Sequence, residues 1–146
     1  DMKLFFDTCA VIDYLCNRQN ADSIEKILIK AEKENWECFI SVGSFYTLTY
    51  LIELNLKHNG YSDKRERIDK LRQILAKVLS IFYIAEINPI DLYTCINDYS
   101  FSDLEDCYQY KAALNAQCNY LITLNIRDFK TADTTNIKII EPSEFC

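Results

Sequence analysis

Acidic side chains follow two of the short apolar segments of this chain. Asp7 comes directly after Leu4-Phe5-Phe6, and Asp128 comes shortly after the apolar segment 119–123. A third acid, Asp106, lies in an acidic segment upstream of 119–123. Carboxylate oxygens suit Mg²⁺ and Mn²⁺, and several carboxylates close together repel one another unless a positive charge lies among them. If the fold brings these acids together, they predict a site for Mg²⁺ or Mn²⁺.

The elements that must position these acids are short strands alternating with helices. We expect strands at 3–6, 37–41, 80–87, 119–123 and 137–140, and helices at 8–17, 21–34, 42–58, about 63–78, 89–98 and 102–118. This alternation predicts a single domain, 1–146, with an α/β fold: a three-layer α/β/α arrangement around a mostly parallel sheet of about five strands. Functional residues collect outside the carboxyl ends of such strands, so the acids should converge at one sheet edge.

Each acid also has a purely structural explanation. Asp7 can cap the helix that follows it. Acids in a first helical turn complement the helix dipole, which accounts for Asp103, Glu105 and Asp106, and Ser102 with Glu105 matches a capping box. Asp128 can be an ordinary turn residue. The convergence of carboxylates from distant parts of the chain is what favours the metal site.

Composition excludes several other kinds of site. The chain has 146 residues with a net charge of −6, and it contains two glycines, seven cysteines and one histidine. Two glycines cannot build a P-loop or a dinucleotide-binding fingerprint. The cysteines are scattered without a C-x-x-C pair, so we expect buried, reduced thiols and no zinc site. No apolar run approaches the roughly 18 residues of a membrane span, and we expect a cytoplasmic protein.

Charge is unevenly distributed along the chain. Segment 62–78 carries six basic and three acidic residues, whereas segment 98–106 carries four acids and no base. The net negative charge does not favour a protein whose main task is binding a polyanion, but the distribution of charge matters more than the sum.

Four segments together resemble the PIN domain family, in the branch of bacterial VapC-type toxins. They read FFDTCAVIDYL (5–15), FISVGSFYTLTYLI (39–52), SDLEDCYQYKAALNAQCNYLITLNIRDF (102–129) and IKIIEPSEF (137–145). The most specific parts are the opening D-T-x-x-x-x-D-x-L and the block E-D-x-x-Q-Y-x-A-A-L, which a strand and T-x-N-x-x-D-F follow. The resemblance covers nearly the whole chain, in the family's order.

The resemblance implies a metal-dependent endoribonuclease that hydrolyses RNA phosphodiester bonds and leaves a 5′-phosphate and a 3′-hydroxyl. It implies Mg²⁺ or Mn²⁺ as cofactor, held by catalytic acids that match Asp7, Asp106 and Asp128. The supporting positions that it implies are Thr8, Asp103, Glu105, Thr123 and Asn125. It also implies the toxin of a toxin–antitoxin pair, with RNA as substrate and with a small antitoxin protein and a second copy of the chain as partners.

One position departs from the family pattern, and two alternatives stay open. Many PIN nucleases have a glutamate where this chain has Thr47. The first alternative is therefore a catalytically weak or inactive relative that binds RNA or a protein partner. The second is a phosphotransferase of the haloacid-dehalogenase type, with Asp7 as nucleophile, but Cys9 occupies the place of that family's second aspartate.

Basic side chains on the helix after residue 62 are the candidates for contacts with the RNA backbone. The alternative is a solvated face that balances the acids elsewhere. The residues concerned are Lys64, Arg65, Arg67, Lys70 and Arg72.

Overall fold

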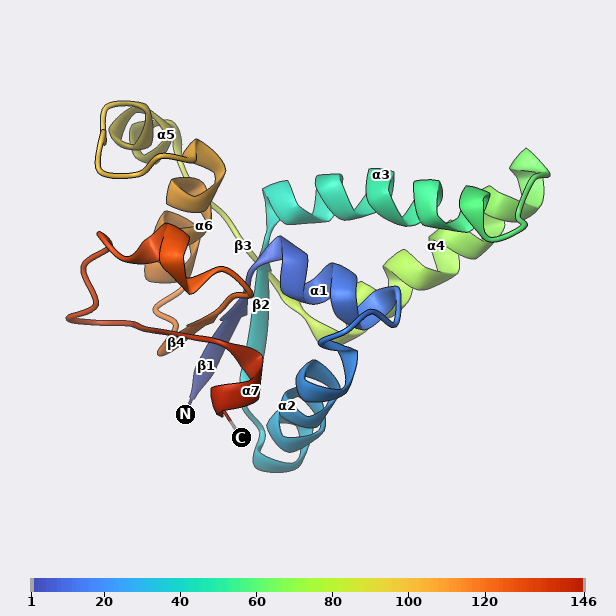
Figure 1. Cartoon of the computed structure of the whole chain (residues 1–146), viewed down its shortest axis with the longest axis horizontal. Coiled ribbons are helices and arrows are strands. Elements are labelled where there is room, and N and C mark those ends of the chain that lie inside the picture. Colours follow the sequence, from blue (N-terminus) through green and yellow to red (C-terminus); the bar gives the residue numbers. More distant parts are fainter. Residues whose placement is uncertain (1, 146) are drawn as a thin grey trace.

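Five short apolar segments form one parallel sheet in the computed structural model, which describes residues 2–145 (Figure 1). The strands are β1 (Lys3–Phe6), β2 (Glu37–Ser41), β3 (Tyr83–Ala85), β4 (Tyr120–Ile122) and β5 (Lys138–Ile140). Their order is β3-β2-β1-β4-β5, and every pair is parallel. The chain thus extends the sheet first on one side of β1 and then on the other. In open α/β sheets, ligands bind at the carboxyl ends of the strands where this reversal occurs.

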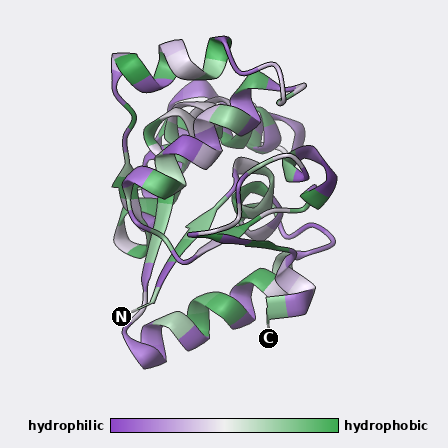
Figure 2. Ribbon diagram, turned by 90° about the vertical axis from the view of Figure 1, so that its left-hand side faces the viewer, coloured by the Kyte–Doolittle hydropathy of each residue, from purple (hydrophilic) through white to green (hydrophobic). Residues whose placement is uncertain are grey.

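Helices cover both faces of the sheet, which confirms the predicted three-layer α/β/α fold. They are α1 (Thr8–Leu15), α2 (Ala21–Glu34), α3 (Val42–His58), α4 (Lys64–Ile81), α5 (Pro89–Ile96), α6 (Leu104–Asn115), the 3₁₀ helix η1 (Ile126–Phe129) and α7 (Pro142–Phe145). Successive side chains of β1 point to opposite faces. Leu4 and Phe6 pack with α1 to α4, and Phe5 packs with α5 and α6. Apolar and polar residues alternate along the surrounding helices, as expected for helices packed by one face (Figure 2).

Helices α3 and α4 form a hairpin that projects from the body of the molecule (Figure 1). Helix α3 ends at His58, and Gly60 takes a left-handed φ of +98° in the turn that follows. Asp63 caps α4, because its carboxylate accepts the N–H of Glu66 at 3.0 Å. We refer to this hairpin, residues 42–81, as the arm.

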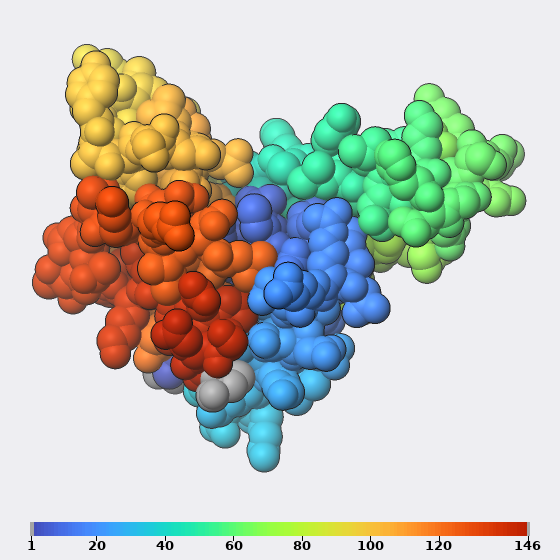
Figure 3. All heavy atoms as spheres, in the orientation of Figure 1, coloured from blue at the N-terminus to red at the C-terminus, as the bar shows by residue number. Residues whose placement is uncertain are grey.

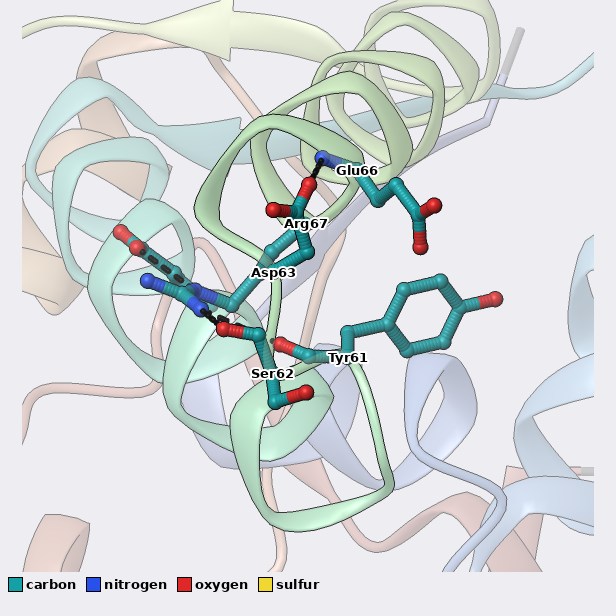
Figure 4. A network of polar contacts seen from close by, with 6 residues as sticks. Tyr61, Ser62, Asp63, Glu66 and Arg67 are labelled. Atoms are coloured by element: carbon teal, nitrogen blue, oxygen red, sulfur yellow. Dashed lines mark hydrogen bonds and ion pairs between the residues drawn. The ribbon is translucent and has the colours of Figure 1, made fainter.

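Arg67, on α4, connects α3 and the turn between the two helices at the end of the arm, and it is only 7% exposed. Its Nε donates to Oε2 of Glu53 at 3.1 Å. Its Nη1 donates to the carbonyl oxygens of Tyr61 at 3.1 Å and Ser62 at 3.2 Å (Figure 4). A guanidinium held in this way is not free to contact a phosphate, so Arg67 does not belong to the basic side chains available for RNA binding.

Two expected features of the elements are wrong. Strand β3 begins only at Tyr83, because the apolar face of α4 continues through Val78 and the helix ends at Ile81. The capping box between Ser102 and Glu105 does not form. Asp103 is instead the extended residue at the start of α6, and its carboxylate accepts the N–H of Glu105 at 2.9 Å. A carboxylate at this position also complements the helix dipole.

The cysteines of the described residues are all free thiols. As predicted, Cys38, Cys95, Cys107 and Cys118 are buried, whereas Cys9 is exposed and Cys16 is half-buried; Cys146 lies outside the described residues. None of the helices in residues 2–145 combines the length and the apolar character that crossing a membrane requires.

Candidate active site

Asp7 occupies the end of β1 and the start of α1 at the same time. Its N–H still donates to the carbonyl of Ile122 on β4, at 2.9 Å, so strand pairing fixes the backbone. Its Oδ1 accepts the N–H of Thr8 at 2.9 Å, which makes Asp7 the N-cap of α1. The side chain is 7% exposed at the carboxyl edge of the sheet. The structural explanation for Asp7 is therefore correct, and it coexists with the site described below.

Two further donors hold the Asp7 carboxylate. The side-chain amide of Gln109, on α6, donates to Oδ1 at 3.1 Å, and the hydroxyl of Thr123, directly after β4, donates to Oδ2 at 2.9 Å. A carboxylate offers about four lone-pair positions, two on each oxygen. Oδ1 accepts two protein donors and Oδ2 accepts one, so Oδ2 retains capacity for a cation.

Asp106 lies in the first turn of α6 and is half-buried. Its Oδ2 is buried without a hydrogen-bond partner among the described residues. Burial, followed by the charges of Asp103, Asp7, Asp128 and Glu105, raises the pKa of this carboxyl group from 3.8 to about 7. Four acids therefore act on Asp106 electrostatically, and its buried oxygen has no donor to offset them.

Glu105 and Asp128 extend the same negative field. The pKa of Glu105 is raised mainly by burial and, to a smaller extent, by the charges of Asp103 and Asp7. Asp128 is exposed in η1, where its N–H donates to the carbonyl of Asn125 at 3.1 Å. These acids come from three separate segments, so the concentration of charge at this edge is a product of the fold.

Thr123 connects the loop after β4 to the carboxylate of Asp7. Its side chain is fully buried and donates to Asp7, while its oxygen accepts the N–H of Asn125 at 3.1 Å. Thr8 also lies in this site, because its hydroxyl contacts the hydroxyl of Ser44. The structure thus places Thr8 and Thr123 beside Asp7, whereas Asn125 reaches the site only through the bond from its backbone N–H to Thr123.

The donor chemistry of this edge fits a hard divalent cation. The available ligands are carboxylate oxygens, one of them an orphaned buried atom, and oxygen ligands with concentrated negative charge suit Mg²⁺ and Mn²⁺. Within residues 2–145, no three His, Cys, Asp or Glu side chains are arranged to enclose a metal ion as they stand. A metal ion held by three such side chains would therefore require some rearrangement of the side chains.

Sequence reasoning missed three polar side chains of this site: Ser41, Ser44 and Gln109. Ser41 ends β2 and caps α3, accepting the N–H of Ser44 at 2.9 Å. Gln109 is 2% exposed and bonds to both serines. A usable signal was the spacing of three residues from Asp106 to Gln109, which places both side chains on one face of α6.

Thr47, the departure from the family pattern, lies one turn beyond Ser44 on α3 and is half-buried. Among the contacts of residues 2–145, its side chain makes no hydrogen bond and does not join the network around Asp7.

The surface is hollowed between the start of α3 and the α5–α6 side, above the strand ends (Figure 3). The start of α4, with exposed Lys64 and Arg65, lies at the far end of the arm instead (Figure 1).

The comparisons with known proteins agree with this fold. The sequence model of the PIN domain matches residues 3–127, and the chain therefore belongs to the PIN domain family. No curated protein matches the sequence.

Three solved toxin–antitoxin structures are similar in fold. VapBC2 from Rickettsia felis, bound to a DNA fragment from its promoter, has a TM-score of 0.69 at 18% identity, covering 96% of this chain and 98% of that one. VapBC-1 from nontypeable Haemophilus influenzae has a TM-score of 0.65 at 16% identity, covering 97% and 99%. A toxin–antitoxin complex from Klebsiella pneumoniae has a TM-score of 0.60 at 21% identity, covering 95% and 97%.

Proposed function

We propose that this chain is a Mg²⁺- or Mn²⁺-dependent endoribonuclease that acts as the toxin of a toxin–antitoxin pair. The observation that carries the proposal is Asp106, whose orphaned buried oxygen lies within the field of Asp7 and Asp128. Membership of the PIN family supports a nuclease, and it argues against the haloacid-dehalogenase alternative.

In this mechanism Asp7, Asp106 and Asp128 would hold the metal at the carboxyl ends of the strands. A metal held there would neutralise charge on the phosphoryl oxygens and lower the pKa of a water molecule, which would favour hydrolysis. Thr8, Gln109 and Thr123 fix the orientation of the Asp7 carboxylate by hydrogen bonds. Gln109 and the Thr123 hydroxyl therefore limit the movement of the Asp7 carboxylate, so that less ordering of this side chain is needed when the substrate binds.

The direct test is cleavage of a mixed pool of structured and single-stranded RNAs by the purified protein. Cleavage should require Mn²⁺ or Mg²⁺, stop with a chelator and leave 5′-phosphate ends. A folded protein that cuts no RNA with either ion would favour the alternative, a PIN-like protein that binds RNA or a partner without cutting. Thr47 is the residue that supports this alternative.

Reversing charge on the arm should weaken RNA binding. Arg65 and Arg72 are both exposed, and their spacing of seven residues places them on one face of α4. Arg65→Glu with Arg72→Glu should lower RNA affinity and flatten its dependence on salt, because each lost phosphate contact reduces counterion release by about one ion. Fluorescence anisotropy at several salt concentrations measures both effects. Unchanged affinity and slope would assign this face to solvent or to protein contacts.

We also propose that two apolar surfaces bind protein partners. Helix α5 exposes Ile90, Tyr93 and Ile96 at 75%, 68% and 49%, and an apolar cluster of this kind is typical of an interface. We assign it to a second copy of the chain. A groove of about 700 Å³ between α2 and the end of α4, lined in part by Ile29 and Leu79, is the candidate surface for the antitoxin.

A matched pair of variants separates these two surfaces. Ile90→Glu places a charge on the exposed face of α5 and should convert a dimer to a monomer, because a buried unpaired charge is costly. Ile29→Glu, at 60% exposure on α2, should leave the dimer intact and weaken binding of the antitoxin. Light scattering gives the mass, and co-purification with the product of a neighbouring short reading frame gives antitoxin binding. A monomeric wild type would contradict the assignment of α5.

A further inference from the structure

The side chain of Gln109 is the point at which three segments of the chain meet. Its amide nitrogen lies 3.1 Å from Oδ1 of Asp7, 3.1 Å from the hydroxyl oxygen of Thr8 and 2.8 Å from the hydroxyl oxygen of Ser44, so its two N–H groups are shared among three acceptors. Its carbonyl oxygen accepts the hydroxyl of Ser41. Gln109 itself belongs to α6, whereas its partners lie at the end of β1, the start of α1, the end of β2 and the start of α3.

Chemistry fixes the direction of this amide. An ionised carboxylate can only accept hydrogen bonds, so the nitrogen of Gln109, and not its oxygen, must face Asp7. The oxygen is then left to accept the hydroxyl of Ser41, and both ends of the amide are satisfied. At 2% exposure no water is needed to complete these bonds, so the side chain is held in one orientation.

Gln109 and Asp106 are separated by three residues on α6, so their side chains share one face of the helix. Fixing Gln109 to Asp7 therefore also fixes where the first turn of α6 presents Asp106. The backbone of α6 contacts β2 and β4, but Gln109 supplies the bonds that reach the carboxylate of Asp7 and the start of α3. Gln109 thus links the helix that carries Asp106 directly to the carboxylate of Asp7.

We propose that Gln109 is a positioning residue that holds Asp7 and Asp106 in register for one divalent cation. The inference rests on the proposed function and goes beyond it, because it assigns control of metal affinity to a neutral side chain that would not touch the metal. An amide suits this position because it donates a hydrogen bond to the carboxylate of Asp7. A glutamate here would repel that carboxylate, and an apolar residue could not form a hydrogen bond with it.

Gln109→Met tests the proposal, because methionine has a similar length and no donor. It should weaken Mn²⁺ affinity by about 10- to 100-fold, the usual effect of losing a partner of a metal ligand. Calorimetric titration gives the affinity, and circular dichroism checks the fold. High Mn²⁺ should restore much of the cleavage, which a general structural defect would not allow. The matched control is Gln73→Met, the same change at an exposed position of α4.

A milder variant covers the case in which Gln109→Met does not fold. Ser44→Ala removes one partner of Gln109 and should weaken Mn²⁺ affinity by a smaller factor. If Gln109→Met, or Ser44→Ala where the first does not fold, binds Mn²⁺ like the wild type, the proposal is overturned. It is equally overturned if cleavage falls while Mn²⁺ affinity stays unchanged. The proposed function fails in a different way, with a folded wild type that neither binds Mn²⁺ nor cuts RNA.

Discussion

Asp106→Asn should reduce RNA cleavage by about 100-fold or more while the fold is retained. Loss of a partner of a metal ligand costs about 10- to 100-fold, and loss of a ligand should cost at least as much. Asparagine is nearly isosteric with aspartate, so the variant should keep its α6 helix and its circular dichroism spectrum. The measurement is the rate of Mn²⁺-dependent cleavage of the mixed RNA pool.

Asp69→Asn is the matched control, because it makes the same chemical change at an exposed position of α4. It should cut RNA at the wild-type rate. Wild-type cleavage by Asp106→Asn would mean that the site lies elsewhere in the chain. Equal losses in both variants would point to a general effect of charge, and not to a metal ligand.

The same substitution should stabilise the metal-free protein at high pH. The pKa of Asp106 is raised from 3.8 to about 7 in the folded chain, chiefly by burial. A carboxyl group whose pKa is higher in the folded chain than in the unfolded chain stabilises the fold at a pH below its unfolded pKa. This stabilisation is lost as the pH rises through about 7, the pKa in the folded chain. Asp106→Asn should therefore match the wild type at pH 4 and exceed it at pH 8. A shift of this size corresponds to about 4 kcal/mol without screening; because Asp106 is only half-buried, we expect about 1–2 kcal/mol.

Chemical denaturation in the presence of a chelator, at pH 4 and at pH 8, measures this difference. If the two proteins are equally stable at both pH values, the neighbouring acids do not crowd Asp106 as the structure indicates. The comparison is independent of catalysis, so it tests the electrostatics of the site even if the chain cuts no RNA.

Mn²⁺ should raise the stability of the wild type by about 2.7 kcal/mol at 100 times its dissociation constant, because it binds the folded chain alone. For a chain of this size, that corresponds to a rise in Tm of roughly 5–10 °C. Asp7→Asn should reduce this rise in Tm, since it removes the negative charge of the carboxylate. Oδ2 of that carboxylate is the oxygen with remaining capacity to bind a cation. Asparagine also caps helices well, so the start of α1 should survive. Thermal melts across a Mn²⁺ series give the result.

Asp69→Asn again serves as the control and should respond to Mn²⁺ like the wild type. An undiminished response of Asp7→Asn would remove Asp7 from the proposed ligands. No response of the wild type to either Mn²⁺ or Mg²⁺ would remove the metal site itself and leave the binding-only alternative.

The sequence by itself predicted the α/β class, the parallel sheet and the family, because these depend on local patterns. The apolar run ending at Asp7 and the helical spacing of α2 report burial directly. The same patterns led to Asp7 and Thr123, which end strands and must therefore lie at the sheet edge. The predicted roles of Asp106 and Asp128 as ligands came from the family resemblance and remain predictions.

Only the tertiary structure decided which side chains meet. Gln109 appeared in the sequence only as part of the E-D-x-x-Q-Y-x-A-A-L block, and nothing local indicates that its amide reaches Asp7, 102 residues away in sequence. Arg67 appeared as one of several basic residues, yet the turn of the arm buries it against Glu53. The crowding around Asp106 likewise depends on segments that meet only once the sheet has formed. Hydrogen bonds and charge interactions act over a few ångströms in space, and proximity of this kind is set by the fold rather than by sequence spacing.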